Sequence, residues 1–170
     1  FVKSDDSPEY FGTVAADPSV TTELPVLEWF VANPGAAETR SGTRASVYYA
    51  GDFYDNVFTR IRGFSATWWN KKSYKFDFNT GNHFLFAPDQ PRVDEINVNA
   101  TYVDKSYIRP VLAFEALDDA GVASPRAYNM RVHQNGEFYS VAVFVEQVDR
   151  DFLRRQDLDP DGALYKFSEN

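Results

Sequence analysis

The chain is 170 residues long, 44% of its residues are apolar, and its formal net charge is −8. This length and apolar content suit one domain with a sizeable core, and the acidic balance argues against binding to nucleic acid polymers or to anionic membranes. Cysteine is absent, which excludes disulfides and thiolate zinc sites. No apolar run approaches the ~20 residues that a spanning helix needs, so we expect no membrane insertion.

The N-terminal part is expected to form an arm followed by a strand. Residues 1–24 are rich in Asp, Ser, Thr and Pro and show no sustained period, whereas residues 25–31 are compact and apolar. Alternating residues in 44–50 and 53–62 flank Gly51-Asp52, which predicts a β-hairpin.

The next strand, residues 71–79, carries lysines on both faces. Lys72 shares a face with Tyr74, while Lys75 lies on the opposite face. Residues 63–70, which include Trp68, precede the strand as a loop. Lysines of this kind either bind an anion in a cleft or are solvated on an edge strand, and the residue types alone leave both readings open.

A helix is expected over residues 107–120, after a short strand at 96–100. The helix contains Glu115 among apolar neighbours, and a carboxylate in such surroundings needs a partner because an unpaired buried charge is costly. Lys72 and Lys75 are the candidate partners.

The C-terminal third predicts a second hairpin and a short helix. Strands at 126–132 and 137–148 flank an Asn135-Gly136 turn, and a helix follows at 149–155. The end of the chain, at 163–167, has the composition of a short strand.

Two motifs suggest ligands. Arg60 and Arg62 share a strand face immediately before Gly63 and Ser65, and guanidinium groups with backbone amides suit phosphate oxygens. Solubilising arginines at a strand end are the alternative.

The second motif is Asp157-x-Asp159-x-Asp161-Gly162, which matches the first half of an EF-hand loop. Position twelve is Ser168, so calcium competes with an ordinary Asp-Pro-Asp-Gly turn.

Several segments taken together resemble the CotH (spore coat protein H) kinase family, whose members are secreted or surface proteins. The resemblance spans residues 55–167 and rests on Arg60-Ile61-Arg62-Gly63-Phe64-Ser65, Lys71-Lys72-Ser73-Tyr74-Lys75, Asn97-Val98-Asn99, Asp104-x-Ser106-x-x-Arg109, Ala120-Gly121-Val122-x-x-Pro125-Arg126, Asn135-Gly136-Glu137-Phe138, Val145-Glu146-Gln147-Val148-Asp149 and Gly162-Ala163-Leu164-Tyr165-Lys166.

The resemblance implies an atypical protein kinase that uses ATP and magnesium and acts on serine or threonine hydroxyls of protein substrates or coat proteins, at the cell surface or outside the cell. It also implies that the catalytic and metal-binding aspartates of the family would lie beyond this chain. The implied nucleotide-binding residues are Arg62, Ser65, Lys72, Lys75, Glu115 and Glu146, the last at the hinge that faces the adenine.

The resulting fold expectation is an α+β domain, mainly antiparallel sheet with one principal helix, resembling the small lobe of an atypical protein kinase. Residues 1–40 would be an arm with the first strand, and residues 41–170 a small-lobe region that is truncated before the large lobe and inactive by itself. The competing hypothesis is a non-catalytic extracellular surface or adhesion module that binds calcium at Asp157, Asp159 and Asp161, or glycans near Trp68.

Overall fold

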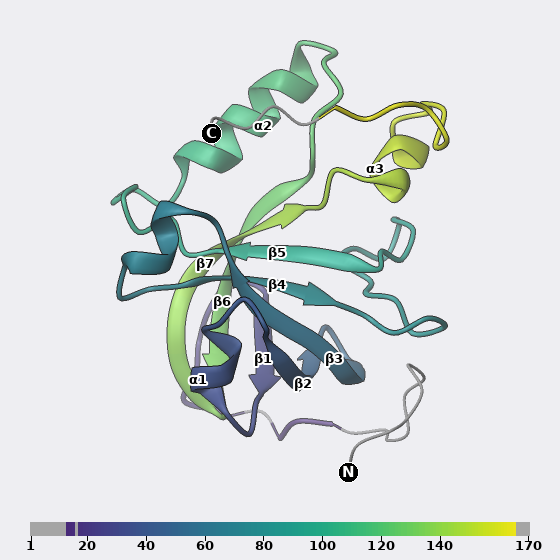
Figure 1. Ribbon diagram of the computed structural model, residues 1–170. Coiled ribbons are helices and arrows are strands. Elements are labelled where there is room, and N and C mark those ends of the chain that lie inside the picture. The colour runs from purple at the N-terminus through teal and green to yellow at the C-terminus, as the bar shows by residue number, and fades with distance from the viewer. Residues whose placement is uncertain (1–12, 16, 166–170) are drawn as a thin grey trace.

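Seven strands form a closed barrel in the computed structural model, which describes residues 13–15 and 17–165 (Figure 1). Their order around the barrel is β1-β2-β3-β4-β5-β7-β6. The strands are β1 (Val26–Phe30), β2 (Thr43–Tyr49), β3 (Asp52–Arg62), β4 (Ser73–Asp77), β5 (Glu95–Asn99), β6 (Ala127–Gln134) and β7 (Glu137–Glu146).

The pairing of β1 with β6 closes the barrel. This pair is parallel, with Leu27 opposite Val132 and Glu28 opposite His133, whereas the other strand pairs are antiparallel. Parallel neighbours cannot be joined by a tight turn, so this seam unites segments that are far apart in the sequence. The first strand is therefore part of the barrel wall.

Aromatic side chains fill the barrel. Trp29 of β1 lies 5.0 Å from Tyr74 and 5.4 Å from Phe76 of β4, measured between ring centroids. Phe84, from the segment between β4 and β5, lies 5.0 Å from Tyr49. These residues are almost fully buried, so aromatic packing makes up much of the barrel core.

The expectation of an α+β small lobe with a principal helix is wrong, because the sheet closes on itself. The helices are α1 (Pro34–Ala37), α2 (Arg109–Asp119) and α3 (Arg150–Arg155), with a 3-10 turn, η1 (Ser65–Trp68). None of the residues of α2 is buried. Figure 1 shows α2 and α3 beside one end of the barrel, and they do not form a layer that covers it. No helix in residues 13–15 and 17–165 is long and apolar enough to cross a membrane.

Most of the local elements are confirmed. Both hairpins, the remaining strands and the helices at α2 and α3 lie where their patterns predicted them, within a few residues. Asn135 and Gly136 have φ values of 54° and 86°, as a tight hairpin turn requires. The short helix α1 was missed, although Asn33 caps it and Pro34 begins it. Residues 163–165 are not in a strand, and residues 166–167 lie outside the described residues.

We expect Gly42→Ala to destabilise the barrel by about 2 kcal/mol or more, because two costs combine. Gly42 has a φ of +64°, and a Cβ there would lie 2.4 Å from the Thr59 carbonyl oxygen. Gly81→Ala is the matched control, since Gly81 has a φ of +85° but no atom within 4 Å of the added Cβ. Urea unfolding of both variants measures the difference, and equal losses would contradict the close packing at Gly42.

Candidate functional site

Three cations lie on the outer face of strands β3 and β4. Arg60 is opposite Lys75 in the strand register, and Arg62 is opposite Ser73. The intervening residues Ile61 and Tyr74 are buried in the barrel, so Arg60, Arg62 and Lys75 point outward. We call these three residues the basic face. These three side chains are cationic on a chain whose net charge is −8, although two carboxylates lie beside Lys75.

Lys75 is held by two carboxylates. Its Nζ lies 2.6 Å from Glu95 Oε1 and 3.3 Å from Asp77 Oδ1, and its side chain is 15% exposed. Sequence reasoning missed both partners. Asp77 lies two residues after Lys75, on the same face of the strand, and this spacing was a readable signal. Glu95 became a partner only through the pairing of β4 with β5.

Arg62 is positioned by a neighbouring strand. Its Nη1 donates a hydrogen bond of 2.5 Å to Asn99 Oδ1 on β5. Burial of the guanidinium, with a smaller contribution from the charge of Arg60, lowers the pKa of Arg62. Gly63 follows with a φ of 92°, and its carbonyl accepts a hydrogen bond from Arg40. The backbone of Ser65 begins η1, whereas its side chain lies outside the described part of the chain.

Lys72 lies before β4 begins. Its Nζ donates a 2.9 Å hydrogen bond to the Thr67 carbonyl oxygen, and its backbone N–H donates to the Tyr139 hydroxyl. It therefore braces the loop that contains η1. Of the two lysines that the sequence left open, Lys75 is the one on the basic face.

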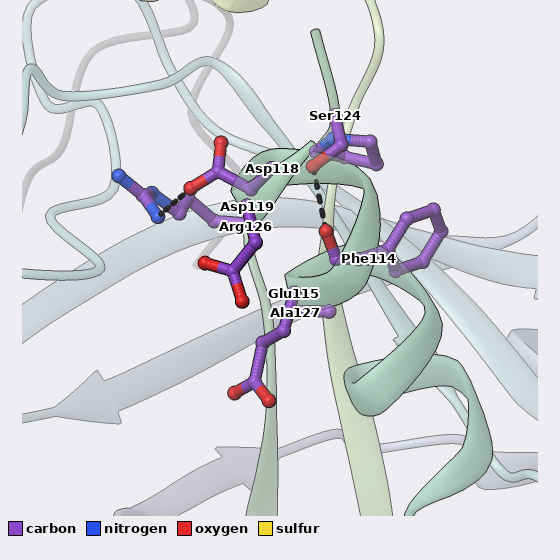
Figure 2. Close-up of a pocket in the computed structure, with 8 residues that line it drawn as sticks. Phe114, Glu115, Asp118, Asp119, Ser124, Arg126 and Ala127 are labelled. Atoms are coloured by element: carbon purple, nitrogen blue, oxygen red, sulfur yellow. Dashed lines mark hydrogen bonds and ion pairs between the residues drawn. The ribbon is translucent and has the colours of Figure 1, made fainter. Parts of the chain in front are cut away.

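Glu115 lies on α2, at a cavity of about 250 Å³ between α2 and the start of β6 (Figure 2). In Figure 2, Asp118 forms the ion pair of this cavity, with Arg126 at 3.2 Å, whereas no dashed line reaches Glu115. Glu115 is exposed, and among the described residues no ion pair joins it to Lys72 or Lys75. The expected lysine–Glu115 pair is not formed in this structure.

Glu146 takes part in a buried ion pair at the end of β7. It is 2% exposed, and its carboxylate accepts hydrogen bonds from Arg155 Nε at 2.8 Å and from Arg155 Nη2 at 2.7 Å. The backbone N–H of Arg126 donates to the same carboxylate, at 2.9 Å. In addition, Arg155 donates to the Ser124 carbonyl oxygen. Glu146 thus ties α3 and the segment before β6 to the barrel, a role that the sequence did not reveal.

The three aspartates of the calcium-like motif form a turn. Asp159 Oδ1 accepts a hydrogen bond of 3.0 Å from the Asp161 backbone N–H, and Asp161 pairs with Arg150 at 3.1 Å. Asp157 is exposed and has a φ of 54°. Within residues 13–15 and 17–165, no three His, Cys, Asp or Glu side chains are grouped to hold a metal ion. The calcium role of these three aspartates stays a prediction.

Comparison with known proteins gives two matches. Residues 59–170 match the family model described as CotH kinase protein. Over 104 residues the chain is 33% identical to inner spore coat protein H of Bacillus subtilis (strain 168), an alignment that covers 61% of this chain and 27% of the relative. The chain thus spans about a quarter of the length of this curated relative. The matched region contains the basic face, Glu115 and Glu146.

Proposed function

This chain belongs to the CotH kinase family, and from that premise we propose that it supplies the nucleotide-binding residues of a protein kinase. The nucleotide is ATP with magnesium, and the phosphate acceptor is a serine or threonine hydroxyl of a protein substrate. The observation that carries the proposal is the alignment of Arg60, Arg62 and Lys75 on one outer face of β3 and β4.

Phosphate groups fit this basic face for chemical reasons. Guanidinium and ammonium groups form strong charge-assisted hydrogen bonds with phosphate oxygens. Lys75 and Arg62 are each fixed by a neighbour, Glu95 and Asn99 respectively, which reduces the entropy that they lose on binding. Gly63, at a positive φ directly after Arg62, has no side chain to keep an anion away from its backbone.

The described residues supply cations for the nucleotide but no group of acidic side chains for the magnesium. Asp77 and Glu95 are already engaged by Lys75. In phosphoryl transfer the metal ion neutralises charge on the phosphate oxygens, and the metal ion needs protein ligands of its own. We therefore assign binding of the ATP phosphates to this chain. Transfer of the phosphoryl group is assigned to the full-length protein of the family.

The location of the protein is proposed from the relative. Inner spore coat protein H is, by its name, a coat protein. A coat or surface location for this chain agrees with that name, and coat or surface proteins are then the nearest candidates for the phosphate acceptor.

Titration of MgATP into the isotope-labelled chain tests the proposal by NMR. We expect saturable shifts of the backbone amides of β3, β4 and the loop at 63–70. Lys75→Met should weaken binding by about tenfold or more, because it removes a charge-assisted contact to phosphate.

The matched control is Arg92→Gln, since Arg92 pairs with Asp52 away from the basic face. It removes one positive charge and should leave the affinity for MgATP unchanged. Absence of saturable shifts in the parent chain, or equal weakening in both variants, would overturn the proposed phosphate site.

A further inference from the structure

A second cavity, of about 490 Å³, lies against the outside of the barrel seam. Residues of β1, β2, β6, β7 and the turn between β6 and β7 line it, together with residues between 14 and 22. The basic face lies on β3 and β4, so the two sites do not share strands. A volume of this size lies within the usual range for small-molecule sites, roughly 300 to 1,000 Å³.

Three charged or titratable residues form a connected network in the wall of this cavity. Glu28 Oε1 lies 2.8 Å from His133 Nδ1, directly across the parallel seam. Arg131 Nε donates a 2.8 Å hydrogen bond to His133 Nε2. Because arginine can only donate, Nε2 is the acceptor and the proton of the neutral imidazole lies on Nδ1, toward Glu28. Glu28 therefore orients His133, and His133 orients Arg131.

Arg131 is held in place through its Nε atom and its guanidinium plane, but its two Nη atoms have no partner among the described residues. Its guanidinium carbon lies 4.4 Å from the centroid of the Phe138 ring, in a cation–π contact, and its Nε is bonded to His133. Within residues 13–15 and 17–165, neither Nη1 nor Nη2 of Arg131 has a hydrogen-bond or ion-pair partner. Arg131 lines the cavity, and its planar pair of Nη donors is suited to bind a carboxylate through two parallel hydrogen bonds.

The carboxylates around the cavity do not occupy this pair of donors. Glu28 accepts from His133, and Asp17 Oδ1 accepts from the backbone N–H and hydroxyl of Ser19. These hydrogen bonds lower the pKa of Asp17. Glu137 is exposed at the turn. The guanidinium of Arg131 is therefore the one cationic group in the described lining, apart from His133 if it is protonated.

Most of the remaining wall is apolar or aromatic. Val20, Val26, Phe30 and Phe138 line the cavity beside Tyr48. We propose that this cavity binds an amphipathic monocarboxylate, with the carboxylate on the Nη atoms of Arg131 and the apolar body against these side chains. His133 and Glu28 are positioning residues that hold the guanidinium in place. The site is independent of the proposed nucleotide site.

Isothermal titration of octanoate into this chain at neutral pH tests the proposal. We expect saturable binding of one octanoate, with affinity at least about tenfold lower in Arg131→Gln, because a charge-assisted contact is lost. Arg131→Lys should also bind more weakly, since an ammonium cannot reproduce the pair of donors. Octylamine, which has the same apolar body and the opposite charge, should not compete with octanoate.

Arg154→Gln is the matched control, since Arg154 is an exposed arginine on α3 that pairs with Asp151. It should bind octanoate as the parent chain does. Thermal unfolding of each variant establishes that it is folded. If Arg131→Gln does not fold, Phe138→Ala replaces it, because Phe138 is 51% exposed and its loss removes one wall and the cation–π contact. No binding of octanoate, unchanged affinity in these variants, or equal binding of octylamine would overturn the site.

Discussion

Replacing Arg155 by methionine is expected to lower the free energy of unfolding by about 3 to 5 kcal/mol. Arg155 is the charged partner of Glu146, and the side chains of the two residues are 8% and 1% exposed. The variant keeps the aliphatic volume but leaves the Glu146 carboxylate with the Arg126 backbone N–H as its remaining donor among those described. An uncompensated buried carboxylate costs more than the loss of one contact, because it has also lost its hydration.

Arg154→Met is the matched control for this prediction. Arg154 is the adjacent residue on the same helix and pairs with Asp151, but its side chain is 57% exposed. Exposed pairs contribute little, so the control should lose about 0.5 kcal/mol or less. Urea unfolding at neutral pH compares the two variants. Similar small losses in both would mean that the Glu146–Arg155 pair is open to water in solution.

Trp29→Ala is expected to destabilise the chain by about 3 to 5 kcal/mol, because it removes a fully buried side chain and leaves a cavity. Trp29 is 0% exposed and lies on β1, yet its ring contacts Tyr74 and Phe76 on β4. These contacts cross the interior of the barrel. The variant therefore tests whether β1 closes the barrel, as well as the packing of one residue.

Trp68→Ala provides the comparison, since Trp68 is 82% exposed in η1. Removal of an exposed side chain away from the core should change stability by less than about 0.5 kcal/mol. Chemical unfolding followed by circular dichroism measures both tryptophan variants without relying on tryptophan emission. A small effect of Trp29→Ala would contradict the position of β1 in the barrel wall.

The basic face was readable in part from the sequence. Alternation in β3 placed Arg60 and Arg62 on the same face, and the lysine strand was correctly located. The carboxylates next to Lys75 were not predicted, because the apolar surroundings of Glu115 favoured a partner on the helix. The strand register instead brings Glu95 beside Lys75, and a register between separate strands depends on the whole sheet.

Glu146 shows the same limit. The resemblance to the kinase family implied a role for it at the hinge, at the end of an apolar strand. Its partner, Arg155, lies one short helix later, and the pair forms only because α3 folds back on β7. A sequence pattern reports the period of a strand or a helix, but it does not report the direction in which a connecting segment returns.

The local secondary structure, meaning the strands and the hairpin turns, was determined by the sequence itself. Period-two alternation located the strands, and Asn135-Gly136 set the second hairpin turn, because these signals act between residues close in the chain. The family was also visible in the motifs from Arg60 onward. Closure of the barrel was decided only by the tertiary structure. The parallel pairing of β1 with β6 depends on burying Trp29 against strands distant in the sequence, and no local propensity encodes that contact.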